Sequence, residues 1–433
     1  MTQHKWNRRA FLEHILSGYS YLGLRSMLLG VSPAFLSHRL MANDQDRQFL
    51  IFSSEAQGSP LNCNVPGTYI AGVDHPDDPA MEPTNFNLGN VRVRAATPWS
   101  DLRSDLRGRM HFIHNQTEVN AHNEFSEVLY GLGRVKSETG SGAEMIASVV
   151  AQENHQNLGT IIDRPIVLDS TLDFKGNRVR PVTPDLFQAL FSTTGNPQVT
   201  QMMKFRDQAL DTLYADLRKE GTPAQKDFLN AAITSRSQAR LLSEKLADAL
   251  GTLPNNPDEA AVLVAAAICK AGAAPVVNIK MRFGSDNHSD QNLSDEVTET
   301  LASIEHLNKL QGHLVDFGVA DQVTFALQNC FGRTLKRNRR GGRDHNSRHN
   351  VTLLFGPKIK PGVSGGIEVV QNERGAHAVA FNSQTGAPSG SGDIQPSMSF
   401  VSSIKTIYKA CGLPDEIINK RVQGGKLINS VLV

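Results

Sequence analysis

The sequence predicts an α/β fold in which a mainly parallel sheet lies between helices. Two observations predict this class. Short apolar runs with the composition of buried strands alternate along the chain with segments of helical apolar spacing. Clusters of polar residues follow several of these runs, which is where functional loops lie in parallel sheets. With 433 residues, 39% of them hydrophobic and 20% charged, the chain is long enough for one large domain or for two.

The first half of the chain contains three expected strands. Residues 48–58 and 109–115 each read as a short buried strand followed by a polar loop, and 164–170 is a further strand. The apolar residues of 125–129 have helical spacing, so a helix is expected directly after the second strand. From 184 to 250 the chain reads as helical and rich in polar residues, which suits a cap or an insertion.

The second half continues the alternation, with the clearest helix of the chain in its middle. Ser294 can cap that helix, and Asp295 and Glu296 suit the positive end of its dipole. Leucine and isoleucine side chains at helical spacing then form one apolar face. The other expected elements are helices over 258–272 and 399–412 and strands over 274–283, 322–327 and 350–356.

The N-terminus resembles a twin-arginine export signal. Arg8 and Arg9 are followed by Phe11 and Leu12 and then by a broken apolar stretch. This reading places a signal in residues 1–40 and the protein in the periplasm, with no stable membrane span after processing. The alternative is an amphipathic N-terminal helix on a cytoplasmic protein.

Charge and cysteine content exclude some classes of protein. Lys and Arg total 44 and Asp and Glu total 43, so the net charge of +1 gives no reason to expect nucleic acid as the main partner. The four cysteines are far apart and form no CxxC pair, which argues against a cysteine zinc cage. The concentrated basic run, 336–343, is either a solvated loop or an attractor of anions.

Two polar loops combine carboxylates with imidazoles. The first contains Asp286 and His288, and the second contains Asp344, His345 and His349 just before an expected strand. This combination suits zinc, manganese or iron better than calcium. Each loop alone could be a solvated turn, but two such loops at neighbouring strand ends predict a metal site.

Two other loops offer weaker candidates. Residues 114–124 precede an expected helix, whose N-terminus could bind an oxyanion; the alternative is helix capping by Thr117 or Asn120. In the loop after the first strand, Glu55 is the only carboxylate, and it is either a metal ligand or a surface residue.

The order of these pieces resembles a bacterial family, the domain of unknown function 1501, which is related to sulfatases and alkaline phosphatases. The matching pieces are "DNHSDQ" (286–291), "FGRTLKRNRRGGRDH" (331–345), "VTLLFGP" (351–357) and "GGKLI" (424–428). The resemblance implies an alkaline-phosphatase-like α/β domain over 41–433, with 184–250 as a helical insertion.

The resemblance also implies a metal site with one or two divalent ions, zinc or manganese. Asp344 and His345 would hold one ion, and His349 would reach a second ion completed by Asp286 and His288. Two such cations, roughly 4 Å apart, clamp the attacking and leaving oxygens of a transferred group. Anionic esters would be attracted by Arg333 or Arg343, which suits a hydrolase of phosphate or sulfate esters.

The nucleophile expected from related enzymes is missing. Its place falls on Ala121, which has no nucleophilic atom, and the nearby candidates are Thr117 and His122. Two functions therefore stay open on the sequence. One is a metal-dependent ester hydrolase, and the other is a non-catalytic relative that binds a partner or serves envelope assembly.

Overall fold

The computed structural model describes most of the chain after the N-terminal segment. The described residues are 46–58, 60–169, 172–191, 197–227, 229–230, 233, 246, 249–283 and 286–433. The expected export signal in residues 1–40 lies outside these ranges. No helix of the described ranges is both long enough and apolar enough to cross a membrane.

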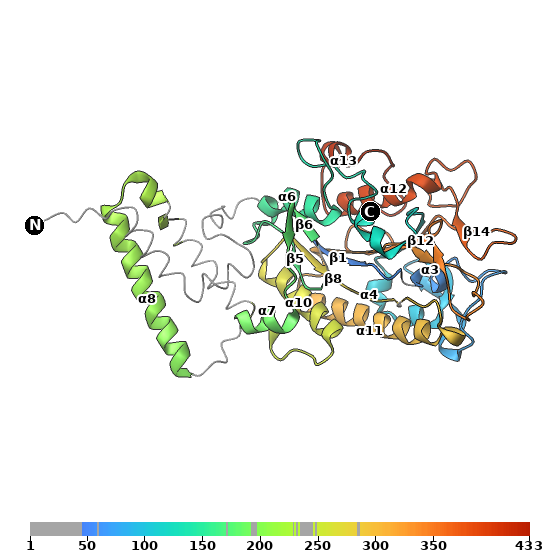
Figure 1. The fold of residues 1–433 in the computed structure, drawn as a ribbon, viewed down its shortest axis with the longest axis horizontal. Helices are drawn as coiled ribbons and strands as arrows, with labels where there is room; N and C mark the ends of the chain where they lie inside the picture. Colours follow the sequence, from blue (N-terminus) through green and yellow to red (C-terminus); the bar gives the residue numbers. More distant parts are fainter. Residues whose placement is uncertain are drawn as a thin grey trace, which may run out of the picture.

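A seven-stranded sheet forms the centre of the molecule (Figure 1). Its strand order is β13-β4-β12-β9-β1-β8-β5, and β12 is antiparallel to both of its neighbours whereas the other pairs are parallel. The predicted α/β class with a mainly parallel sheet is therefore confirmed. The strands are β1 (Phe49–Glu55), β4 (Met110–Asn115), β5 (Ile166–Val167), β8 (Val276–Ile279), β9 (Val323–Asn329), β12 (Asn350–Phe355) and β13 (Gly362–Ser364).

Helices cover both faces of this sheet, as Figure 1 shows. Alternate residues of β1 enter two separate cores because successive side chains of a strand point to opposite faces. Phe49 and Ile51 pack with α10 (Pro257–Ala271) and α11 (Ser294–Asp316). Leu50 and Phe52 pack in the other core, whose helices are α6 (Ile146–Leu158), α12 (Pro396–Ala410) and α13 (Asp415–Arg421).

The start of α11 differs from its prediction in one respect. Asp290, not Ser294, provides the cap: its carboxylate accepts the backbone N–H groups of Asp295 and Glu296. The hydroxyl of Ser294 donates to the same carboxylate at 3.3 Å. A carboxylate beside the positive end of the helix dipole stabilises it further.

Smaller elements surround the main sheet. Two described helices, α7 (Pro184–Phe191) and α8 (Pro197–Glu220), lie in the helical stretch expected over 184–250, and α8 stands apart from the helices that cover the sheet (Figure 1). The remaining helices are α3 (Leu61–Asn64), η2 (Pro79–Met81), η3 (Thr97–Asp101), α4 (Ser104–Arg107), η4 (His122–Glu124), α5 (Phe125–Leu129) and η5 (Gln291–Leu293). Four two-stranded sheets pair β2 (Pro83–Leu88) with β3 (Val91–Ala96), β6 (Leu172–Phe174) with β7 (Asn177–Val179), β10 (Gly332–Arg333) with β11 (His345–Asn346), and β14 (Ile367–Val369) with β15 (Ala376–Ala378).

The reversed direction of β12 determines which loops meet. The loops after β1, β4, β8 and β9 leave the same edge of the sheet, since these strands all run in one direction. The segment before β12 lies at this edge as well, because β12 runs the other way. Polar residues from distant parts of the sequence are thereby brought together.

Candidate metal centre

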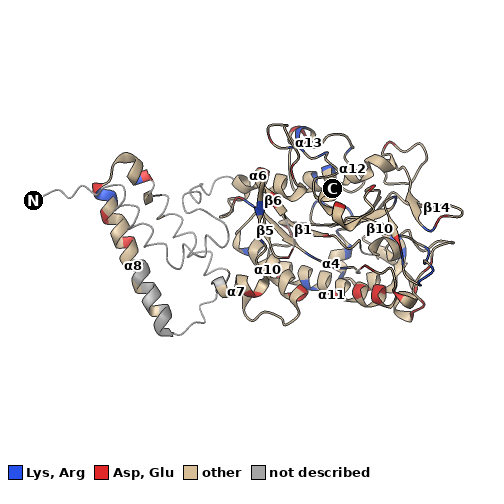
Figure 2. Cartoon of the chain, viewed as in Figure 1, with Lys and Arg blue, Asp and Glu red and all other residues tan. Residues whose placement is uncertain are grey.

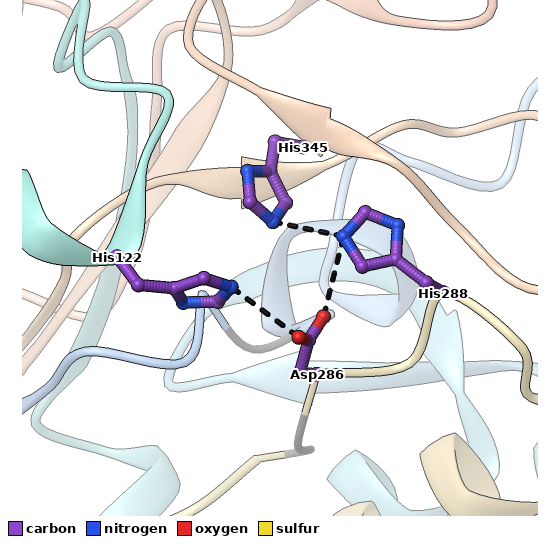
Figure 3. A group of neighbouring side chains, drawn as sticks. All are labelled: His122, Asp286, His288 and His345. Carbon is purple, nitrogen blue, oxygen red and sulfur yellow. Dashed lines mark hydrogen bonds and ion pairs between the residues drawn. The ribbon is translucent and has the colours of Figure 1, made fainter.

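Four side chains converge at this edge. His122, Asp286, His288 and His345 each offer one ligand atom, and these atoms all lie within 4.8 Å of one another (Figure 3). They come from the loops after β4 and β8 and from the segment before β12. We call these four residues the metal group.

Each imidazole of the metal group is held through its Nδ1 atom. Nδ1 of His122 lies 2.7 Å from the carbonyl oxygen of Ala56, and Nδ1 of His345 lies 2.6 Å from that of Asn120. Nδ1 of His288 lies 3.3 Å from a carboxylate oxygen of Asp344. All three partners only accept hydrogen bonds, so each ring carries its hydrogen on Nδ1 and presents an unprotonated Nε2 when neutral.

The three Nε2 atoms face one another and Asp286. Nε2 of His288 is 3.0 Å from Nε2 of His345 and 3.3 Å from Asp286 Oδ1, while Nε2 of His122 is 3.3 Å from Asp286 Oδ2. Lone pairs at such distances repel unless a positive charge lies between them. Three imidazole nitrogens and one carboxylate oxygen, with Nδ1 of each ring held by an acceptor, are a donor set that fits zinc or another first-row divalent cation.

The charges around the group favour a neutral imidazole and an ionised carboxylate. Burial lowers the pKa of His345, and the nearby guanidinium of Arg333 lowers it further. Burial raises the pKa of Asp286, but the charge of Arg333 and its hydrogen bond to Oδ1 at 3.0 Å outweigh this and leave the pKa below its ordinary value. Both protonation states are those that metal binding requires.

Aromatic packing orients His345. Its ring stacks on Phe331 with 4.0 Å between the centroids, and His122 meets the same phenyl ring edge-on at 5.1 Å. His345 lies in β11, which pairs with Arg333 in β10. The ring is therefore fixed by the backbone, by Asn120 and by Phe331.

Asp344, expected as a metal ligand, lies behind His288 instead of in the metal group. Its Oδ1 faces Nδ1 of His288 and accepts the amide N–H of Asn338 at 2.9 Å, and its Oδ2 accepts Nη1 of Arg374 at 2.5 Å. Burial raises the pKa of Asp344, but these partners outweigh it and hold the pKa below its ordinary value. Asp344 thus orients an imidazole of the group.

His349, the other expected ligand of that loop, also lies outside the metal group. It is fully buried, with Nε2 at 2.9 Å from Nδ1 of His114 and Nδ1 at 3.2 Å from the amide nitrogen of Asn62. His114 Nε2 is 2.9 Å from the carbonyl oxygen of Pro66. These contacts form a consistent neutral chain in which each ring donates once and accepts once. Here His349 is a core histidine whose hydrogen bonds are satisfied.

Glu55 and Thr117 are buried and lie outside the metal group. Glu55 ends β1, and its carboxylate accepts the backbone N–H of Gln57 at 2.7 Å. The hydroxyl of Thr117 has no hydrogen-bond partner among the described residues, and its side chain is fully buried. Neither residue is part of the metal group.

Arg333 and Arg343 are both buried in the protein. Arg343 donates all five of its N–H groups, to the carboxylate of Glu296 and to the carbonyl oxygens of Asp74, Thr334 and Leu335. Arg333 bonds Asp286 and the carbonyl oxygens of Gln57, Gly58 and Arg343. The structure therefore gives these arginines internal partners in place of the expected substrate.

Several residues that shape the site were not singled out from the sequence. Asn338, Arg374 and Phe331 orient Asp344 and His345, and His122, which the sequence suggests as a catalytic residue, lies in the metal group. The sequence signal for Asn338 was weak, since a lone asparagine inside a basic run is typical of a solvated loop. Phe331 begins the "FGRT" piece, and the position of this piece before the loop with Asp344 and His345 is the only feature of the sequence that points to it.

Comparison with known families gives one match. Residues 169–382 match the model of the family described as "Protein of unknown function (DUF1501)", which confirms the resemblance expected from the sequence. No curated protein matches the chain.

The chain is also similar, at low levels of identity and TM-score, to solved structures of a lipoteichoic acid synthase, an alkaline phosphatase and a sulfatase. The lipoteichoic acid synthase LtaP from Listeria monocytogenes is 9% identical, with a TM-score of 0.34 over 95% of this chain and 82% of that one. The alkaline phosphatase from the Antarctic bacterium TAB5 is 10% identical, with a TM-score of 0.29 over 72% and 93%. BT1596, a 2-O GAG sulfatase, is 10% identical, with a TM-score of 0.29 over 86% and 72%.

Proposed function

We propose that the protein is a metal-dependent hydrolase of phosphate or sulfate esters, with zinc or manganese held by the metal group. The observation that carries the proposal is the 3.0 Å contact between Nε2 of His288 and Nε2 of His345. Both rings are held through Nδ1 by acceptors, so a positive charge must lie between the two Nε2 atoms, and we propose that a metal cation supplies it.

The geometry favours one ion over two. Among the described residues, only His122, Asp286, His288 and His345 form a group of this kind. The second ion predicted from the sequence depended on His349, which is hydrogen-bonded to His114 and Asn62 in the core. We therefore propose a single divalent ion.

The site is open enough for a substrate to reach it. The side chain of Asp286 is 42% exposed, that of His122 is 35% exposed and that of His288 is 28% exposed. A bound cation would supply Lewis-acid stabilisation of the negative charge that develops on an ester oxygen. The chain's own contribution is to orient the imidazoles through Ala56, Asn120 and Asp344.

The attacking group in this proposal is water. Ala121, at the N-cap of η4, has no nucleophilic atom, and the hydroxyl of Thr117 is buried. His122 directs Nε2 toward Asp286 as part of the metal group. None of these residues is placed to form a covalent bond with a substrate, so hydrolysis would proceed by one direct displacement.

A second function has specific support. The absence of a nucleophile at Ala121 and the internal bonding of Arg333 and Arg343 suit a protein that binds a metal without catalysis. Such a protein would bind a partner or take part in envelope assembly.

One experiment separates the two functions. Purified protein is loaded with zinc or manganese and assayed with an aryl phosphate and an aryl sulfate. The variants His345→Ala and His377→Ala are assayed in the same way. His377→Ala is the control, because the ring of His377 pairs with Glu373 outside the metal group. Turnover that His345→Ala abolishes and His377→Ala retains supports the hydrolase. Bound metal without turnover of either ester supports the binding protein, and equal turnover in all three proteins contradicts the site.

We also propose export to the periplasm through the twin-arginine route. The support is the run of Arg8, Arg9, Phe11 and Leu12 in the sequence.

A further inference from the structure

A tight turn lies beside the metal group, in the basic run 336–343. The backbone N–H of Asn338 donates to the carbonyl oxygen of Gly342 at 2.7 Å, and that of Gly341 donates to the carbonyl oxygen of Asn338 at 3.2 Å. Gly341 has φ +87°, a conformation that favours glycine. Arg339 and Arg340 form the tip of this turn.

The turn is fixed on the segment that carries His288. The side-chain amide of Asn338 donates to the carbonyl oxygen of His288 at 3.0 Å, and the backbone N–H of Arg343 donates to that of Asn287 at 3.1 Å. A Cβ atom on Gly342 would lie 2.0 Å from the carbonyl oxygen of Asn287, so only glycine allows this close approach. The tip is thus held at a set position relative to the metal group.

The two arginines at the tip have charges that no acidic side chain in the described part of the chain pairs with. Arg339 and Arg340 are exposed, and neither makes an ion pair with any residue in the described part of the chain. Two other arginines of the basic run do have partners within the protein. The side chain of Arg337 donates to the carbonyl oxygen of His75, and that of Arg343 is buried and donates to the carboxylate of Glu296. Figure 2 shows Lys and Arg among the charged residues on the loops beside β10.

Such an arrangement suits the recognition of an anion. Two neighbouring guanidinium groups on one turn create a local positive potential, which attracts anions. Guanidinium groups bind sulfate and phosphate oxygens through paired hydrogen bonds. An anionic group of a ligand would satisfy the unused donors of Arg339 and Arg340.

We infer that the substrate carries at least two sulfate or phosphate groups, one at the metal group and another on Arg339 and Arg340. The inference rests on the proposed function and names its preferred substrate class as oligoanionic esters, which should bind more tightly than isolated monoesters. The fixed turn sets the separation of the two groups, so binding depends on how the anionic groups are spaced along the ligand.

The test uses a polyanion that binds metals weakly. Titration calorimetry measures the affinity of zinc-loaded protein for sucrose octasulfate and for methyl sulfate. The variant Arg339→Gln/Arg340→Gln is compared with Arg134→Gln/Arg180→Gln, which removes the same charge from two exposed arginines that follow α5 and β7. We expect the tip variant to weaken octasulfate binding by about tenfold, equivalent to about 1.4 kcal/mol, and the control to leave it unchanged.

The possible results separate this inference from the proposed function. Two results overturn the second anion site. One is a loss of octasulfate affinity that is equal in the two double variants, or absent from both. The other is equal affinity of the wild type for sucrose octasulfate and methyl sulfate. Metal content of the same samples tests the proposed function: protein that takes up no zinc contradicts it, whatever the affinity for octasulfate. If the double variant loses metal, Arg339→Gln and Arg340→Gln are titrated singly, and unchanged octasulfate affinity in both overturns the inference.

Discussion

Nε2 of His288 and Nε2 of His345 lie 3.0 Å apart, and both rings are fixed by acceptors at Nδ1. A proton shared between the rings or a bound cation can stabilise this contact. Burial lowers the pKa of His345, which disfavours the proton. The convergence of His122 and Asp286 on the same point favours the cation.

The first prediction concerns metal content. His345→Ala removes one of the four proposed ligands, so the protein should retain less zinc or manganese and melt at a lower temperature. A metal present at 1,000 times its Kd adds about 4 kcal/mol to the free energy of unfolding, and the variant would lose most of it. Elemental analysis and thermal unfolding measure both effects. His377→Ala is the control, and full metal content with an unchanged Tm in His345→Ala would contradict the site.

The second prediction distinguishes a ligand from the residue that orients it. Asp344→Asn leaves the four ligand atoms in place but weakens the interaction with Nδ1 of His288. We expect metal affinity to fall by about 10- to 100-fold, as for other carboxylates that orient a ligating histidine. Competition with a chromogenic chelator gives the affinity. Complete loss of metal would instead make Asp344 a ligand, as the sequence had indicated.

Most of the sheet could be predicted from the sequence, but the direction of β12 could not. Val351, Leu353, Leu354 and Phe355 make the run 350–356 mainly apolar, as expected for a buried strand, and such a run carries no information about direction. Direction depends on pairing with β4 and β9, far away in the sequence. The order of apolar runs and helical segments was sufficient for the fold class.

The candidate site was predicted in part, for a similar reason. Asp286, His288 and His345 were expected to meet because each lies next to a strand end. His349 is four residues beyond His345 and has the same chemistry, yet it enters the core beside His114. Which of two histidines in one loop faces solvent depends on backbone direction and packing, which local sequence does not record.

The third prediction concerns pH. Burial lowers the pKa of His111 and of His114 from 6.5 to about 4 and lowers that of His349 well below 6.5. Between pH 7 and pH 5 the unfolded chain takes up protons at these positions and the folded chain does not. The free energy of unfolding should therefore fall over this range, by about 2 kcal/mol for each of His111 and His114, and His349 should add to the fall.

Urea unfolding of metal-free protein at several pH values measures this dependence. The stability should be fully present above about pH 6.5, the pKa of an unfolded histidine, and decrease as the pH falls toward the lower folded values. His349→Gln removes one titrating group, so its stability should depend less steeply on pH than that of the wild type. A free energy of unfolding that stays constant from pH 7 to pH 5 would show that these histidines are protonated in the folded protein.

The fourth prediction concerns export. Twin-arginine signals depend on both arginines, so replacing Arg8 and Arg9 with lysine should retain the protein in the cytoplasm. The replacement keeps the positive charge, and any effect therefore reports recognition of the arginine pair. Fractionation of cells that express the tagged protein measures its distribution. An unchanged distribution between the compartments would argue against this route.

The fifth prediction concerns the course of hydrolysis. The position expected for a nucleophile is occupied by Ala121, and the hydroxyl of Thr117 is fully buried. A covalent intermediate would require two displacements, which together retain the configuration at phosphorus, whereas direct attack by water inverts it. A phosphoester made chiral with oxygen isotopes should therefore give an inverted product.

Two outcomes would contradict direct attack. One is retention of configuration, and the other is a covalent adduct on Thr117 or His122, found by mass spectrometry after rapid quenching. Thr117→Val is a useful companion, because it removes the hydroxyl and nearly preserves the shape of a side chain that has no hydrogen-bond partner among the described residues. If water attacks directly, Thr117→Val should hydrolyse the ester at the wild-type rate. A large loss of rate in a folded, metal-loaded Thr117→Val protein would instead assign the attack to its hydroxyl.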